Sequence, residues 1–302
     1  MPEFRGVENK VAPLLLRRII FAIGFGALAF VVTAVVGGVW AALLAINLAT
    51  SPAVPWSVVV MAGILWLLWR YLGGAWLPRS ASDARRRLLR ARRVPGSLFA
   101  GAVVAGLFAI VALAGLWVVL TKLVSLPARA LPNYAQYPFI TVALALIMAS
   151  LVGAFLEEAL FRGYFQGILE GWIGAVGAIL LTMLLMSPEH SLTQGFAWPV
   201  VLFYFAVDIM LGAVAYLTQS ILPGIVIHTV GLLVFFTLVW PGDVVRQIVG
   251  QGSADTWLWI HVAQTILFAA VAILAFILLA RSTSAIRASS GKSSLHVIEN
   301  RL

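Results

Sequence analysis

Two adjacent glutamates, Glu157 and Glu158, lie with Arg162 in a segment that is otherwise apolar enough to enter a lipid bilayer. Placing a charged side chain at the centre of a membrane helix costs on the order of 2.5–3.5 kcal/mol on the most lenient insertion scale. Ionisable residues in such segments usually have a function, because the cost would otherwise be avoided. In a membrane, a carboxylate of this kind can act as a general base or as a metal ligand.

The direction of each side chain follows if this segment is an α-helix, which we expect because no helix breaker precedes Gly163. Residues four apart share a helix face, so Glu158 and Arg162 can pair, which lowers the cost of burying both. Glu157 points about 100° away and has no such partner. It must then face the protein interior or a wet cavity, and it is our candidate base. The alternative is a buried ion-pair network that only holds helices together.

Two histidines follow Glu157 in apolar surroundings, His190 after Pro188 and His228 after Pro223. From the helix rise of about 1.5 Å per residue, the three side chains can approach one another in depth if the chain reverses near Gly171. Two imidazoles and a carboxylate could bind a divalent metal such as zinc, or could activate a water without a metal. Both possibilities stay open, as does the role of each histidine as a hydrogen bond between helices.

The composition indicates an integral membrane protein with an all-α fold. Of the 302 residues, 62% are hydrophobic and 10% are charged, and the chain has no cysteine. A soluble domain is about half apolar and a quarter charged. Segments of about 20 apolar residues cross a bilayer as helices, and we predict a polytopic bundle of about eight. The predicted spans are 19–48, 56–76, 98–121, 138–161, 172–188, 198–219, 221–240 and 257–280.

Basic residues predict the orientation of this single membrane domain, 1–302. Seven arginines and one aspartate lie between Arg79 and Arg93, and such loops are cytoplasmic by the positive-inside rule. Eight spans then place both termini in the cytoplasm, with 281–302 as a flexible basic tail. We assign the arginines to topology and to contact with anionic lipids rather than to nucleic acid.

The order of these residues resembles the CPBP family of intramembrane proteases, which includes CAAX prenyl endopeptidases, bacteriocin-processing proteins and abortive-infection proteins. The resemblance covers 155–232. The motifs that carry it are Glu157-Glu158 with Arg162, then His190, and then His228 preceded by Gly212, Tyr216, Ser220, Pro223 and Gly224.

The resemblance implies an intramembrane endopeptidase, with or without a metal, that cleaves a membrane-associated or prenylated peptide. It makes Glu157 the base that activates water, and His190 and His228 its partners in holding that water or a metal. Glu158 with Arg162 would be a supporting pair. A bacterial plasma membrane is the expected location.

Two positions depart from the family pattern. Met186 replaces a phenylalanine, which we expect packing to tolerate. Leu232 replaces an asparagine or aspartate four residues after His228, so a donor for the oxyanion is missing; such a donor contributes about 2.7–4 kcal/mol to transition-state stabilisation. Asp208 is a candidate substitute and a supporting site residue.

Two other functions use the same residues. Leu232 favours a non-catalytic scaffold or immunity protein that keeps the family fold. A proton-coupled transporter could use Glu157, Asp208 and the histidines as a relay, although the sequence shows no inverted pair of interrupted helices. Other intramembrane protease chemistries lack their motifs here, since neither His-Glu-x-x-His nor Gly-x-Ser-x-Gly occurs.

Overall fold

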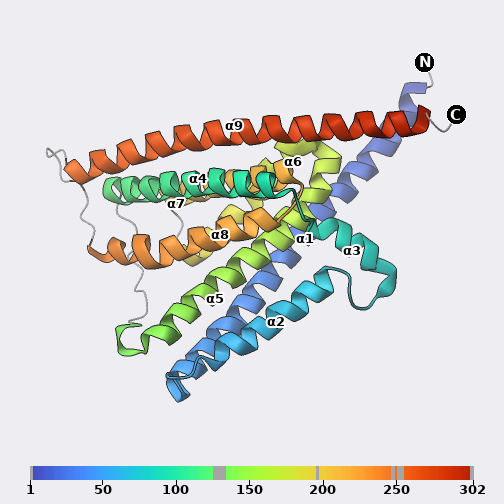
Figure 1. The fold of residues 1–302 in the computed structure, drawn as a ribbon. Coiled ribbons are helices and arrows are strands. Elements are labelled where there is room, and N and C mark those ends of the chain that lie inside the picture. Colours follow the sequence, from blue (N-terminus) through green and yellow to red (C-terminus); the bar gives the residue numbers. More distant parts are fainter. Residues whose placement is uncertain (1–2, 125–133, 195–196, 246–248, 250–254, 300–302) are drawn as a thin grey trace.

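The computed structural model describes residues 3–124, 134–194, 197–245, 249 and 255–299, and every regular element in these ranges is a helix. This confirms the predicted all-α fold. Figure 1 shows the arrangement. The principal helices are α1 Glu3–Thr50, α2 Trp56–Leu72, α3 Ser82–Leu89, α4 Gly96–Leu123, α5 Phe139–Glu157, η3 Glu158–Phe165, α6 Gln166–Gln194, α7 Trp198–Thr218, α8 Leu222–Val234, η4 Phe235–Val239 and α9 Thr256–Glu299. Short 3₁₀ turns are η1 Arg79–Ala81, η2 Tyr134–Gln136 and η5 Trp240–Val245.

Six stretches of the described chain are long and apolar enough to cross a membrane, so this is a multi-pass integral membrane protein. One of them, Phe139–Met186, contains both the fourth and the fifth predicted spans. The helix is broken inside it at Gly174, where φ is 75°, three residues after Gly171, near which the sequence analysis assumed a reversal. The second predicted span forms the 17-residue helix α2, which is short for a full crossing. The cytoplasmic placement of the termini stays a prediction.

The bundle has two parts that meet along α5 and α8. Helices α1 and α2 contact each other and α5, whereas α4 packs along α9 and against α7 and α8 (Figure 1). The largest buried cluster lies among α4, α7 and α8 and is centred on aromatic side chains such as Trp117 and Phe203. Apolar side chains of α1 and α9 point outward, which is typical of surfaces that face lipid. Helix α9 continues through 281–299, and the flexibility of this tail stays a prediction.

The glutamate segment is not the continuous α-helix that the sequence predicted. From Glu158 to Phe165 the chain forms a π-helix, and all eight of its residues are buried. A π-helix bonds each N–H to the carbonyl five residues back, so it is wider than an α-helix and is frequent at functional sites. The sequence has no helix breaker before Gly163 from which the π-helix could be predicted. The wider turn redirects the side chains of Glu158 and Arg162 compared with an ideal α-helix.

Gly163 lets this π-helix touch the backbone of the end of α3. A Cβ at Gly163 would lie 2.8 Å from the carbonyl oxygen of Leu89, whereas a Cβ at Gly171 would meet nothing within 4 Å. The two glycines are two turns apart on one chain, but only the first lies at a close helix contact.

Gly163→Ala should therefore destabilise the protein by about 1–3 kcal/mol, because backbone atoms must move to admit the methyl group. Gly171→Ala is the matched control and should be neutral or slightly stabilising, since alanine favours helix by up to about 1 kcal/mol. Thermal unfolding in detergent measures both. Equal melting temperatures for the two variants would contradict the close contact.

Candidate active site

His228 lies between the two adjacent glutamates. Its Nδ1 is 3.2 Å from Oε1 of Glu158, and its Nε2 is 3.8 Å from Oε2 of Glu157. Glu158 is fully buried, whereas the side chain of Glu157 keeps 12% of its surface exposed. The contact with Glu158 holds the Nδ1 edge of the ring and turns Nε2 toward Glu157. Glu157, expected to have no partner, therefore faces this imidazole.

Gly224 allows Glu158 to reach His228. A Cβ at Gly224 would lie 2.5 Å from Oε2 of Glu158, so a larger residue would displace the carboxylate. Gly224 and His228 lie one turn apart on α8, and Glu158 begins the π-helix that follows α5. The close approach of α5 and α8 at this glycine sets the position of the histidine relative to both glutamates.

Arg162 binds mainly to Asp208 rather than to Glu158. One guanidinium nitrogen forms an ion pair with Oδ1 of Asp208 on α7, and Nε is 3.8 Å from Oε1 of Glu158. The predicted pair of Glu158 and Arg162 is therefore present, and Asp208 is a closer partner that the sequence analysis did not identify. The second terminal nitrogen contacts the sulfur of Met186, which is fully buried. Met186 therefore fills space and also accepts a contact from Arg162. Asp208 holds Arg162 and does not line the cavity described next.

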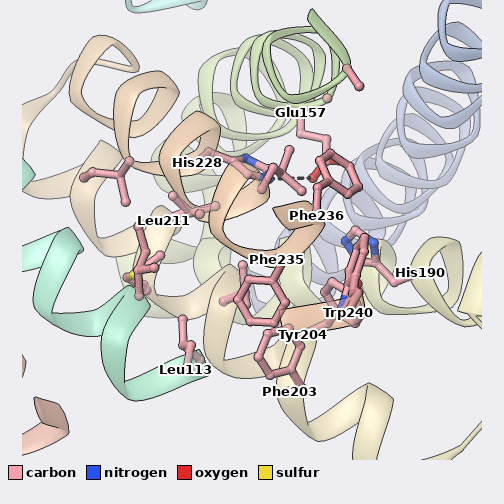
Figure 2. A pocket seen from close by; sticks show the side chains of 18 residues that line it. Leu113, Glu157, His190, Phe203, Tyr204, Leu211, His228, Phe235, Phe236 and Trp240 are labelled. Atoms are coloured by element: carbon pink, nitrogen blue, oxygen red, sulfur yellow. Dashed lines mark ion pairs between the residues drawn. The ribbon is translucent and has the colours of Figure 1, made fainter. Parts of the chain in front are cut away.

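A cavity of about 210 Å³ opens beside Glu157 and His228 (Figure 2). His190 also lines it, as expected, and its ring stacks on Tyr204 with the ring centres 3.8 Å apart and the planes within 9° of parallel. The other lining residues are largely aliphatic or aromatic and come from α4, α5, α7, α8 and η4. The cavity is therefore apolar, with a few polar groups that face one another, as binding pockets commonly are.

Sequence reasoning did not identify the aromatic wall of this cavity. Tyr204 stacks on His190, whereas Phe236 in η4 and Trp240 in η5 come from the irregular end of the seventh predicted span, 221–240. Aromatic residues are common in every span of this chain, so their types give no signal. Only the packing of α7 against α8 brings them to the histidines.

The residues that the resemblance suggests for a metal do not form a metal site in this arrangement. Among the described residues, no group of three histidine, aspartate or glutamate side chains is close enough to hold an ion. Glu157, His190 and His228 line one cavity but do not converge on one point. The residues as placed thus fit a water between Glu157 and His228 better than a zinc ion bound by all three.

Leu232 lies in the wall of the same cavity. One of its methyl carbons is 3.1 Å from the position of a Cβ at Gly153, so the side chain packs onto α5. The place where the resemblance implies an asparagine or aspartate is therefore apolar. Asp208, our candidate substitute, cannot supply that hydrogen bond because it is ion-paired to Arg162 outside the cavity.

Asp208→Asn should destabilise the protein by about 3–5 kcal/mol, because Arg162 would keep a buried charge without its main partner. The double variant Arg162→Met/Asp208→Leu removes both charges and should recover most of that loss. Melting temperatures of the two variants and the wild type test this. If the double variant were no more stable than the single one, the ion pair would not be the reason for the loss.

Residues 139–234 match the family model described as type II CAAX prenyl endopeptidase Rce1-like. This segment holds Glu157, Glu158, Arg162, His190 and His228, and it is about a third of the chain. No curated protein and no solved structure matches. The family match confirms the resemblance to CPBP proteases, and it shows that the segment 139–234, which carries the site, is similar to the Rce1-like CAAX prenyl endopeptidases.

Proposed function

We propose that this protein is an intramembrane endopeptidase in which Glu157 activates a water molecule for attack on a peptide bond. The observation that carries the proposal is the position of Glu157 and His228 at the polar side of an apolar cavity, with Oε2 and Nε2 3.8 Å apart. A water can contact two polar atoms at that separation, since each hydrogen bond needs about 2.8 Å.

Each side chain then has a role. Glu157 takes a proton from the water as the hydroxyl oxygen bonds to the peptide carbon, and it returns this proton to the leaving amine as the C–N bond breaks. Glu158 fixes the His228 ring through Nδ1. His190, held by Tyr204, contributes a second imidazole to the cavity. Arg162, which is held by Asp208, forms an ion pair with Glu158 and keeps it in place.

Charge balance gives His228 a further role in this proposal. Three carboxylates, Glu157, Glu158 and Asp208, surround a single arginine, so the cluster attracts one more positive charge. His228 lies between two of these carboxylates and is the natural place for a proton. A proton on Nε2 would face the cavity and could donate a hydrogen bond to the carbonyl oxygen as it becomes negative. This donor would replace part of what Leu232 cannot supply.

The substrate that fits this site is a membrane-associated peptide with apolar groups next to the cleaved bond. The matched family is named for CAAX prenyl endopeptidases. We propose a peptide or membrane protein with a lipid-modified cysteine near its C-terminus, because the aromatic wall suits such a chain. The proposed setting is a bacterial plasma membrane.

We derive no step through a metal, because Glu157, His190 and His228 do not form an ion-binding group as placed. A bound zinc would polarise the carbonyl and the water if substrate brought the three together. The metal requirement is decided by assaying cleavage after dialysis against a strong chelator and again after zinc is restored.

A scaffold without catalytic activity is the second candidate, and one observation favours it. Leu232 closes the cavity wall at the point where a polar donor is expected. Such a protein would bind the same membrane peptides without cleaving them.

Glu157→Gln should abolish cleavage of a prenylated peptide reconstituted with the protein in vesicles, because the amide keeps the size of the side chain but cannot take a proton. We expect a loss of at least about 100-fold, read by mass spectrometry of the released fragment. Asp83→Asn is the matched control, since it makes the same chemical change on an exposed side chain. Wild-type activity in Glu157→Gln would remove this residue from the mechanism, and a wild type that binds but never cleaves would support the scaffold.

Leu232→Asn should raise the cleavage rate, because it places an amide donor one turn after His228 in the cavity wall. A full oxyanion donor contributes about 100-fold or more to kcat, and a smaller gain is expected if His228 already donates. Leu232→Met keeps the wall apolar and is the control. A gain in both variants would mean that packing, and not the hydrogen bond, limits the rate.

A further inference from the structure

The arginine-rich connection between α2 and α4 contains two classes of arginine. Arg85 and Arg90 are buried and have partners. Arg85 donates to the carbonyl of Trp76 and lies over the ring of Tyr71. Arg90 forms a two-pronged pair with Glu170, so these two arginines serve the fold.

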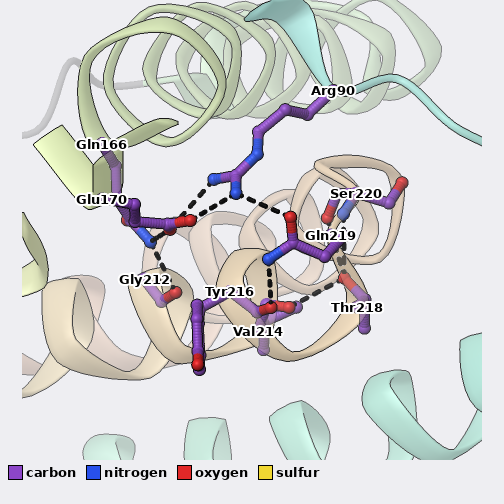
Figure 3. A network of polar contacts seen from close by, with 9 residues as sticks. All are labelled: Arg90, Gln166, Glu170, Gly212, Val214, Tyr216, Thr218, Gln219 and Ser220. Carbon is purple, nitrogen blue, oxygen red and sulfur yellow. Dashed lines mark hydrogen bonds and ion pairs between the residues drawn. The ribbon is translucent and has the colours of Figure 1, made fainter. Parts of the chain in front are cut away.

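Figure 3 shows how Arg90 fixes the end of this connection. Besides Glu170 on α6, its guanidinium donates to Oε1 of Gln219, 2.9 Å away in the turn between α7 and α8. The backbone is held as well, because the N–H of Ile221 donates to the carbonyl of Arg90 over 3.1 Å. These hydrogen bonds therefore fix the position of the backbone at Arg90, next to the arginines on either side of it.

The other arginines of this connection are exposed, and three of them surround a hollow of about 450 Å³. Arg86, Arg87 and Arg92 form its basic part, while Trp69 and Leu89 contribute apolar surface. None of the three arginines forms an ion pair with a described residue, and no carboxylate belongs to the described lining. The hollow shares no residue with the cavity beside Glu157. It is a separate site.

We propose that this hollow binds the phosphate headgroup of an anionic phospholipid. Guanidinium groups bind phosphate through paired, charge-assisted hydrogen bonds, and three arginines line this hollow without a competing acid in the described lining. Basic pockets between membrane helices are suited to such headgroups.

The surroundings of the hollow select a lipid over free phosphate. Trp69 lies at the end of the apolar helix α2, and Trp66, three residues earlier on the same face, is 58% exposed. Leu67 beside it is 42% exposed. Aromatic side chains of this kind mark the level of the lipid headgroups. A phospholipid can therefore place its phosphate among the arginines and its acyl chains along the exposed face of α2, which inorganic phosphate cannot do.

The test measures the selectivity of the full-length protein for lipid in phosphatidylcholine vesicles. Electron spin resonance of spin-labelled phosphatidylglycerol and phosphatidylcholine gives the ratio in which the protein immobilises the two. We compare Arg86→Gln/Arg87→Gln/Arg92→Gln with Arg17→Gln/Arg79→Gln/Arg93→Gln, which removes the same charge from exposed arginines outside the hollow.

The first variant should lose about fivefold or more of the preference for phosphatidylglycerol, and the second should keep most of it. An equal loss in both variants would mean diffuse attraction by net charge and would overturn the site, as would an unchanged ratio in the first. Should the first triple variant fail to fold, the double variant Arg86→Gln/Arg92→Gln replaces it, with Arg79→Gln/Arg93→Gln as control.

A second measurement separates the two sources of phosphate. We compare the melting temperature of the wild type in vesicles of phosphatidylcholine alone, once with inorganic phosphate and once with sodium chloride of equal ionic strength. The two melting temperatures should be the same. A rise with phosphate in the wild type but not in the first triple variant, together with no preference for phosphatidylglycerol, would assign the hollow to free phosphate and overturn the lipid proposal.

Discussion

The buried charges between α5, α7 and α8 are the constraint on which the rest of this structure depends. Glu158, Arg162 and Asp208 are almost entirely shielded, and none of them could stay charged there alone. They are tolerable because the π-helix carries both Glu158 and Arg162, while α7 brings Asp208 and α8 brings His228 to them. Any movement of these helices would leave a buried charge without its partner, so the cluster fixes where the helices cross.

The apolar fold around the cluster serves this arrangement. Gly224 and Gly163 have no side chains where α8 and the end of α3 come close to the glutamate segment. Tyr204 on α7 stacks on His190, and the aromatic residues of η4 line the cavity. Helices α1 and α9 lie at the outside of the bundle, and their exposed apolar side chains are suited to contact with lipid. The close helix contacts and the side-chain stacking described above therefore all involve the matched segment 139–234.

The parts of the structure that follow from composition could be predicted, and those that follow from packing could not. Each predicted apolar span coincides largely with a helix or with consecutive helices, because the need to satisfy the backbone in lipid leaves few alternatives. Glu157, His190 and His228 line one cavity as their order indicated. The π-helix at Glu158 was missed, since it replaces an α-helix with the same residue preferences. The pairing of Arg162 with Asp208 was missed because it joins helices 46 residues apart.

His228 shows why the apolar residue at 232 need not make the site inert. Glu158 accepts from Nδ1 and so determines which edge of the ring meets the cavity. In the proposed mechanism, the excess of carboxylates over arginine in the cluster places a proton on the other edge, beside Glu157. A donor placed there by charge balance needs no asparagine to orient it, because the buried glutamate already does so. The fully buried Glu158 then orients the proposed donor on His228, and Leu232 is free to pack against Gly153.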